Sequence, residues 1–426
     1  MTLPGFIHDI CSAIYPLGIA SPFFRGLPLV KYGLEWIHPL APLAHPFEDG
    51  TAAILERSID ATSQTLGEDA AAYRRLMEPL VANWDNLATD LLAPLHFPRH
   101  PIAFGRFGLI GLRSACGLVR SLFGNHRAPA FFAGLAAHSI LPLDRSLTAA
   151  FGLILGTLGH SVGWPIPRGG SQSFADALAS YFLSLGGEIV TGKRIECLED
   201  LPAARTILFD VTPKQLLKIV QHKFPARYSR RLEHYRYGPG VFKIDWALNH
   251  SIPWKAKECT RAGTVHIGGN LEEIIQSESE VWEGKHAERP FILVAQQSLF
   301  DHTRAPEGKH TAWAYCHVPN GSTYDMSKRI ETQIERFAPG FIDCIIARSL
   351  RSAIELEQYN PNCVGGDING GVQDIYQLFT RPVARLVPYS TPIKGLYICS
   401  SSTPPGGGVH GMCGYYAARA ALKDCF

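Results

Sequence analysis

One segment near the C-terminus constrains the fold more than any other, because its backbone must change direction within a few residues. Residues 396–400 have the apolar character of a buried strand, three consecutive glycines follow at 406–408, and a helix of small residues is expected over 411–423. Glycines let a backbone approach a ligand closely, and the unpaired N–H groups at a helix N-terminus favour negative charge. This order predicts either a ligand-binding loop or an ordinary glycine-rich turn.

Alternating apolar and polar residues predict a sheet in the middle of the chain. Residues 241–246, 291–296 and 311–317 each show this period of two, which is typical of antiparallel strands with one exposed face. A helix over 324–337 is expected to cross this sheet. The middle of the chain therefore predicts a mostly antiparallel sheet.

The segment that precedes this sheet has a different pattern. A helix is expected over 173–185, where Gly186-Gly187 ends it, and a pair of strands is expected within 188–198. A buried strand at 206–211 precedes Thr212-Pro213, where proline suits the first turn of another helix. The fold class predicted from these patterns is α/β, and α+β when the antiparallel sheet is included.

The N-terminal third is expected to be mainly helical. Residues up to about Leu43 are rich in proline, glycine and aromatic side chains, which indicates irregular chain. Apolar residues at helical spacing predict helices over 51–66 and 68–82, and helices are expected to continue to about Gly159. The best apolar run, 149–159, is shorter than the about 20 residues that a membrane-spanning helix needs, so no span is expected.

Three arginines recur every seven residues through an otherwise apolar segment, 104–123. Seven residues make two helical turns, so Arg106, Arg113 and Arg120 would lie along one face of a single helix. One interpretation is a core helix with one solvated stripe. The other is a helix at a membrane surface with its arginines toward lipid headgroups.

Composition excludes several classes of protein. The 40 Lys+Arg residues nearly balance 38 Asp+Glu, so no basic excess is present to bind a nucleic acid. The 10 cysteines include no CxxC pair and no Cys/His cluster at metal-ligand spacing, which predicts reduced, mostly buried thiols and no metal. Residues 1–17 lack the basic flank and apolar core of a signal peptide, so a cytoplasmic protein of two or three lobes is expected.

Landmarks spread along the chain identify a family resemblance. Together they resemble the phytoene desaturase-like family of FAD-dependent oxidoreductases over the whole chain, and their common order is more specific than any single motif. In order they are Pro4-Gly5-Phe6 with Asp9, Pro167-Arg168-Gly169-Gly170, Gly186-Gly187-Glu188-Ile189, Asp210-Val211-Thr212-Pro213, the glycine-rich stretch 365–371, Arg381-Pro382, Thr391-Pro392 and the C-terminal glycine loop.

The resemblance implies a Rossmann-like FAD-binding domain that is assembled from separated segments and joined to a substrate domain. The Arg168-Gly169-Gly170 turn would close one domain onto the other. The implied division is 1–23, 161–235 and 388–426 for the FAD-binding domain, 24–160 for a helical part of the substrate domain, and 236–387 for its sheet part.

The resemblance also implies which residues contact FAD. A helix N-terminus beside the flavin pyrimidine carbonyl would stabilise negative charge on the reduced ring. The expected contacts are the backbone of Ile195 with adenine, Gly406, Gly407 and Gly408 with the ribityl chain and ring, and the amides of Gly411 and Met412 with the carbonyl.

One departure from the family pattern concerns the FAD pyrophosphate. The family opens with a strand, a GxGxxG turn and a helix, and no GxGxxG occurs in residues 1–405; the spacing occurs once, at 406–411, inside the C-terminal glycine loop. The chain resembles a member without roughly its first forty residues, as the size of such a unit suggests, either through a misassigned start or as a shortened protein. We therefore expect FAD to bind weakly or not at all to the chain as written.

The function expected from the sequence is oxidation of a hydrophobic small molecule by hydride transfer to flavin, with oxygen, a quinone or another carrier as acceptor. His410, Tyr415 and Tyr416 are weak candidates for moving a substrate proton, because they lie at or just after the expected flavin edge. The alternative is a non-catalytic relative that binds lipids or proteins.

Overall fold

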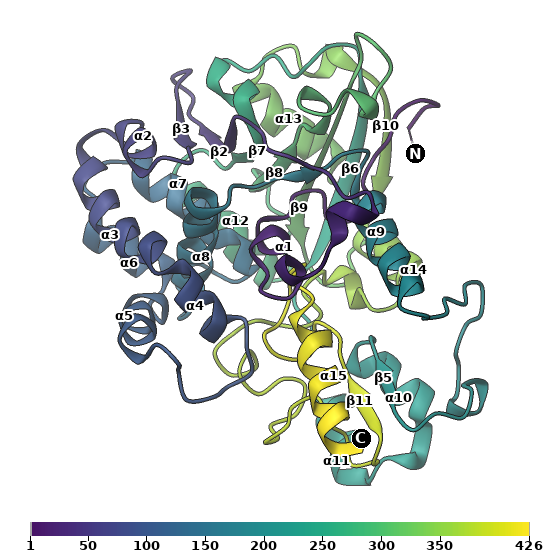
Figure 1. Cartoon of the computed structure of the whole chain (residues 1–426). Coiled ribbons are helices and arrows are strands. Elements are labelled where there is room, and N and C mark those ends of the chain that lie inside the picture. The colour runs from purple at the N-terminus through teal and green to yellow at the C-terminus, as the bar shows by residue number, and fades with distance from the viewer. Residues whose placement is uncertain (1, 426) are drawn as a thin grey trace.

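The computed structural model describes residues 2–425, and a seven-stranded sheet forms its centre (Figure 1). The strand order is β10-β6-β9-β8-β7-β2-β3, and every neighbouring pair is antiparallel except β2 and β7. The predicted antiparallel sheet is therefore confirmed, but the exposed face expected for it is wrong: β7 and β8 are buried throughout, and β9 at all but two residues. Its strands are β2 (Ala41–Pro46), β3 (Ala52–Leu55), β6 (Gly240–Leu248), β7 (Ala262–Ile267), β8 (Ile292–Ala295), β9 (His310–Val318) and β10 (Ile345–Arg351).

Strands β2 and β3 correct the prediction for the N-terminal third. The helix expected over 51–66 is wrong in its first part, since β3 occupies that part and only α2 (Ile59–Gln64) is helical. All residues of both strands are buried. Burial on both faces removes the period-two signal, and Pro42 and Pro46 further disguise β2. The helical segment thus also contributes two strands to the sheet.

A layer of helices packs on one side of the sheet, at the left of Figure 1. The core between them contains Phe131, Phe132 and Leu153, each exposed by no more than 1%. Helix α8 is the centre of this layer and contacts α3, α5, α6 and α7. The helices are α3 (Ala70–Ala82), α4 (Trp84–Leu91), α5 (Pro101–Gly111), α6 (Ala115–Leu122), α7 (Arg127–Ala136) and α8 (Thr148–Ser161).

The expected single helix over 104–123 is wrong, because α5 and α6 meet at an angle of 93°. Ser114 ends the run: its Oγ accepts the Gly117 N–H at 3.1 Å and caps the start of α6. Arg113 lies in the corner, while Arg120 on α6 is 3.8 Å from Glu272. The three arginines therefore do not share one helix face.

A smaller lobe contains the C-terminal helix and a short parallel sheet, at the bottom of Figure 1. Strand β5 (Ile207–Phe209) pairs with β11 (Leu396–Ile398) in parallel, although nearly 190 residues separate them in sequence, and these two predicted strands are confirmed. The strand pair expected within 188–198 is wrong: that segment has no strand in the described structure, and Val190 is 66% exposed. The helices of this smaller lobe are α10 (Pro213–Val220), α11 (Ala226–Glu233) and α15 (Met412–Cys425).

The remaining elements connect these layers. Strands β1 (Trp36–Ile37) and β4 (Ile166–Pro167) form a short antiparallel pair. The mixed α/β class is confirmed, while the division into five segments stays a prediction. The connecting helices are α1 (Pro16–Ala20), α9 (Ser171–Ser184), α12 (Leu271–Trp282), α13 (Ser327–Phe337) and α14 (Ala353–Tyr359).

The turn at Arg168-Gly169-Gly170 is fixed by two carboxylates. Asp9 accepts the Ser171 N–H at 2.7 Å and forms a buried ion pair with Arg304 at 2.5 Å. Asp301 accepts the Gly169 N–H at 2.7 Å. These bonds join the N-terminal segment, the start of α9 and the connection between β8 and β9.

Candidate functional site

Two glycine-rich loops pack against each other at the junction of the lobes. The C-terminal glycine loop, 399–411, follows β11, and the second loop spans 365–371. Ser402 Oγ in the first loop donates to the carbonyl of Gly370 at 2.8 Å. A Cβ added at Gly407 would lie 3.1 Å from the carbonyl oxygen of Asn369, closer than ordinary van der Waals contact. Glycine is therefore needed here for close packing of backbone on backbone.

Asp367 organises the second loop. Its carboxylate accepts the N–H groups of Gly238 at 2.8 Å, Asn369 at 2.7 Å and Gly371 at 3.0 Å. Burial raises the pKa of Asp367, although these bonds and the nearby Arg381 oppose the rise. The carboxylate thus serves as an acceptor for backbone and holds the loop in its folded course.

The buried guanidinium of Arg381 lies behind the C-terminal glycine loop. Its Nη2 donates to the Tyr235 hydroxyl and to the Gly371 carbonyl, each at 3.0 Å. Among residues 2–425, no hydrogen-bond partner faces its Nε or Nη1. A Cβ at Gly406 would lie 2.6 Å from Nη1. Because a buried polar group without a partner is costly, these two nitrogens indicate a place for an electron-rich ligand.

His410 has a structural role in this loop. Its Nδ1 accepts the Met412 N–H at 3.0 Å, so the proton is on Nε2, which donates to the Gly406 carbonyl at 3.2 Å. Burial lowers the pKa of His410 to about 4, which keeps the ring neutral. Both ring nitrogens are therefore engaged with backbone and neither can accept a substrate proton while these bonds persist.

An apolar cavity of about 690 Å³, which we call the inner cavity, extends from the glycine loops into the helical layer. Helices α4, α5 and α8, together with the connection between α4 and α5, supply more than half of its lining residues, and the loops close one end. The wall is mainly apolar with a few polar groups, as in small-molecule sites generally; these lie at the loop end and at Asp90, His96 and His138. The apolar wall includes Phe104, Phe107, Phe151, Ile154 and Leu155, and the loop end includes Asn369, Gln373, Gly407, Gly408 and His410.

His138, which was not predicted as a site residue, also lines the inner cavity. His138 Nε2 is 3.0 Å from His266 Nε2, so one of these nitrogens donates to the other. Burial lowers the pKa of His138 to about 3 and that of His266 well below its ordinary value. The neutral pair gives the apolar wall one polar contact point for a bound molecule.

Asp90 fixes the connection between α4 and α5 at the edge of the inner cavity. It accepts the N–H groups of Arg99 at 2.9 Å and His100 at 3.1 Å, and pairs with His96 at 3.0 Å. Burial alone would raise the pKa of Asp90, but these hydrogen bonds outweigh burial and lower it. The carboxylate is charged and holds this connection in one conformation.

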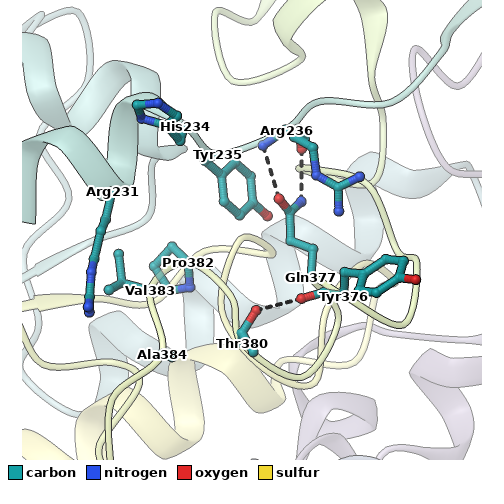
Figure 2. A pocket seen from close by; sticks show the side chains of 10 residues that line it. All are labelled: Arg231, His234, Tyr235, Arg236, Tyr376, Gln377, Thr380, Pro382, Val383 and Ala384. Carbon is teal, nitrogen blue, oxygen red and sulfur yellow. Dashed lines mark hydrogen bonds between the residues drawn. The ribbon is translucent and has the colours of Figure 1, made fainter.

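A separate polar cavity of about 470 Å³ is lined by residues of two segments, 231–236 and 376–384 (Figure 2). The Gln377 side chain bridges the backbone of Arg236, accepting its N–H at 3.0 Å and donating to its carbonyl at 2.8 Å. Tyr235, which also lines this cavity, donates to the Gly370 carbonyl at 2.7 Å. Tyr235 therefore connects the wall of the polar cavity to the second loop.

The structure brings together some of the predicted site residues and separates others. Gly407, Gly408 and His410 line the inner cavity, Gly406 packs on Arg381, and Gly411 immediately precedes α15, which Met412 begins. Tyr415 and Tyr416 are not among the lining residues; they pack against Phe23 and Tyr389. Ile195 packs against the cluster around β5 and β11 instead. The roles predicted for all these residues stay predictions.

Three further residues of the site, Asn369, Gln373 and Arg381, were not predicted as site residues from the sequence. Asn369 and Arg381 belong to landmarks of the family resemblance, but nothing in the sequence assigned either a role at the cavity. Gln373 gave no signal. Among the described residues, no group of three or more His, Cys, Asp or Glu side chains is arranged to hold a metal ion.

Comparison of the sequence with known proteins gives two informative relatives. The chain is 26% identical to pyridine nucleotide-disulfide oxidoreductase domain-containing protein 2 of Rattus norvegicus over 99% of its own length and 86% of that protein. It is 24% identical to the lycopene-forming phytoene desaturase of Pantoea ananas over 60% of its length and 55% of that enzyme. No family model matches the sequence.

Comparison of the structure gives a consistent result. An oxidoreductase from Methanosarcina mazei superposes with a TM-score of 0.63 at 14% identity, covering 98% of this chain and 90% of the other. Putrescine oxidase bound to putrescine superposes with a TM-score of 0.57 at 14% identity, covering 97% and 87%. These matches confirm the resemblance found in the motifs: the chain is a homologue of pyridine nucleotide-disulfide oxidoreductase domain-containing protein 2 and of phytoene desaturase, with the fold of amine oxidase-like oxidoreductases.

Proposed function

We propose that the chain is an FAD-dependent oxidoreductase that oxidises a hydrophobic small molecule held in the inner cavity. One observation carries the proposal: an apolar cavity of about 690 Å³ ends at Gly407, Gly408 and His410, in the loop that the resemblance assigns to the flavin. A substrate in this cavity would contact the cofactor at the loop end, where glycine backbone takes the place of side chains in the cavity wall. The relationship to oxidoreductases supports the reaction class.

The residues at the loop end fit a flavin in two respects. Gly407 and Gly408 line the inner cavity and present backbone to it without a side chain. The unpartnered Nε and Nη1 of Arg381 supply positive charge behind the loop. The residues proposed to hold FAD are Ile195, Gly406, Gly407, Gly408, Gly411 and Met412.

The fit at Met412 requires a rearrangement of one hydrogen bond. Its amide, expected to face the flavin carbonyl, donates to His410 Nδ1 in this structure. A bound flavin carbonyl would compete with His410 for that amide. When bound, FAD accepts a hydride or two electrons and a proton from the substrate.

The protein's own contribution is to position the substrate and to exclude water. Phe104, Phe107 and Phe151 enclose an apolar molecule, which favours binding by the hydrophobic effect. Asn369 and Gln373 offer hydrogen bonds at the loop end, and the His138–His266 pair offers one in the wall. We propose that these groups set the orientation of the substrate toward the glycine loop.

Two glycines on α5 provide a matched test of the substrate site. Gly108 lines the inner cavity and Gly105 does not, and a Cβ at either position would meet no atom within 4 Å. Gly108→Leu is expected to fill part of the cavity and weaken binding of an apolar fluorescent probe by about tenfold, a change of roughly 1.4 kcal/mol. Gly105→Leu should leave the affinity unchanged. Equal affinities for the two variants would place the ligand elsewhere.

Cofactor binding is tested separately on the full chain by titration with FAD, followed by flavin absorbance and fluorescence. Gly407→Val is expected to weaken FAD binding at least about tenfold, because the new side chain would press on Asn369. The control is Gly26→Ala, where a Cβ meets no atom within 4 Å. Because weak FAD binding is expected for the chain as written, the same titration is repeated with a strand–GxGxxG–helix segment fused before residue 1. Probe binding in the cavity without flavin binding by that fusion would reject the enzyme and favour a non-catalytic module for apolar ligands.

A further inference from the structure

Helix α5 also borders a second apolar depression, on the side away from the inner cavity. We call it the outer groove; its volume is about 820 Å³, and α3, α5 and α6 supply most of its lining. Ile102 and Leu109 of α5 line it and are 72% and 80% exposed, respectively. Two large aliphatic side chains, almost two helical turns apart, thus project into solvent beside an apolar groove. Adjacent exposed apolar residues on this scale mark an interaction surface.

The connection between α4 and α5 carries further exposed apolar residues. Leu95 is 70% exposed and Phe97 is 87% exposed. Asp90 accepts the Arg99 and His100 backbone N–H groups, so these side chains are presented by a fixed segment that leads directly into α5.

The charge around the outer groove has a single sign. Arg75, Arg99, Arg106 and Arg113 line it, and its lining includes no Asp or Glu. Arg113 is also tied to the start of α6, where its Nη2 donates to the Gly117 carbonyl at 2.8 Å. A groove with apolar walls and an arginine rim offers complementary contacts to a ligand that has apolar chains and anionic groups.

We propose that the outer groove and the exposed side chains of α5 bind the surface of an anionic lipid bilayer. Aliphatic side chains would enter the region below the headgroups while the arginines contact phosphate or carboxylate groups. Among residues 2–425 no single helix is long and apolar enough to span a bilayer; α5 and α6 reach that length and apolarity only together, with a bend of 93° between them.

The position of the inner cavity is consistent with this surface. Leu95 and Leu112 line that cavity and are 70% and 48% exposed, so its rim reaches the same side of the molecule as α5. An apolar molecule could pass from a bilayer into the cavity with little exposure to water. The membrane contact itself does not depend on the proposed oxidoreductase function, because it requires neither flavin nor turnover.

The test is co-sedimentation of the full chain with vesicles of phosphatidylcholine alone or of phosphatidylcholine mixed with phosphatidylserine. Binding is expected to the mixed vesicles and to be several-fold weaker with phosphatidylcholine alone. Ile102→Glu combined with Leu109→Glu should reduce binding to mixed vesicles by about tenfold or more. The matched control, Val30→Glu with Leu40→Glu, changes two residues that are 76% and 69% exposed elsewhere and should have no effect.

A charge series tests the arginines. Arg75→Glu with Arg106→Glu is expected to weaken binding to mixed vesicles by about tenfold or more. Arg120→Glu with Arg194→Glu changes the net charge equally, but Arg120 faces Glu272 and Arg194 is near Glu196, so less than about a twofold change is expected.

Three results would overturn the proposal. They are absence of sedimentation with either vesicle, equal sedimentation of the wild type and both groove variants, and concentration-dependent dimerisation that the Ile102/Leu109 variant abolishes while vesicle binding is unchanged. The last result would assign the outer groove to a second copy of the chain. Circular dichroism of each variant checks that it is folded.

Discussion

The two sides of helix α5 face apolar spaces of similar size that differ in their surroundings. The inner cavity is about 690 Å³ and ends at glycine backbone, uncharged polar side chains and neutral histidine, with the Asp90 carboxylate at its edge bonded to the α4–α5 connection. The outer groove is about 820 Å³, and arginines border it. Since the helix is apolar on both sides, hydrophobicity alone does not distinguish them. The inner cavity is the more enclosed of the two and suits a small apolar molecule. The outer groove has arginines at its rim and suits an amphipathic surface.

The largest expected effect is a difference in the free energy of unfolding between variants on the two sides of α5. Phe107 points to the inner side and is 6% exposed, whereas Leu109 is 80% exposed on the outer side. Phe107→Ala should lower the free energy of unfolding by about 3 to 5 kcal/mol, because it leaves a cavity in the core. Leu109→Ala should change it by no more than about 0.5 kcal/mol. Urea unfolding measures both; similar losses would mean that α5 packs differently.

The second expected effect concerns the buried histidines behind the inner cavity. Burial lowers the pKa of His45 from 6.5 to about 4, so the unfolded chain binds its proton more readily than the folded chain. The stability from neutral His45 is complete above pH 6.5 and is lost as the pH falls toward 4, by roughly 2 to 3 kcal/mol at about pH 4.5. Unfolding curves at several pH values measure this loss.

The matched variant for this prediction is His45→Gln. Glutamine can still donate to the Gly269 carbonyl, which His45 Nε2 contacts at 2.9 Å, but it does not titrate. The variant should therefore lose less stability than the wild type between pH 6.5 and about 4.5. Parallel pH profiles would show that His45 is not the group responsible. Arginines remain charged throughout this range, so vesicle binding at the outer groove should not follow the same profile.

A smaller effect is expected at Asp90, which lies between the two spaces. Asp90→Asn keeps the shape but loses the charge that accepts the Arg99 and His100 N–H groups. The free energy of unfolding should fall by roughly 1 to 2 kcal/mol. Amide hydrogen exchange should increase at residues 92–100. Unchanged exchange there would show that the carboxylate does not hold the connection that presents Leu95 and Phe97.

The smallest expected effect is a difference in salt dependence. Raising the ionic strength from about 0.1 to about 1 M shortens the screening length from about 10 to about 3 Å. Binding to anionic vesicles should weaken by about fivefold, because exposed arginines contribute to it. Binding of an uncharged apolar probe in the inner cavity should not weaken. If salt weakened vesicle binding and probe binding equally, the two ligands would share a single site.

The helices and strands that were predicted correctly are those whose local sequence pattern is enough to indicate the secondary structure. Strand β9 was predicted from alternation of residue types in its sequence, although most of its residues are buried in the structure, and α10 begins at Pro213 as the proline indicated. Strand β2 escaped prediction because burial of every residue removes that alternation. The bend between α5 and α6 escaped it as well. A regular spacing of arginines says nothing about the Ser114 cap that interrupts the helix.

The candidate site was predictable only where a motif fixes the backbone. Gly407 and Gly408 were identified from the strand–loop–helix order, and the structure places them at the inner cavity. His138 was not, because its neighbour His266 lies 128 residues away in the chain. Arg381 was recognised as a landmark, but its unpartnered nitrogens become visible only when burial is known.

The sequence by itself determined the glycine loop, the order of the landmarks and hence the family resemblance, because backbone conformation and chain order depend on local residue types. Only the tertiary structure decided what the loop faces. Helix α5 comes to lie between the inner cavity and the outer groove through packing on α8, and that packing depends on residues distant in sequence. The physical reason is that a cavity is formed by side chains from several elements, and no single element encodes its shape or its charge.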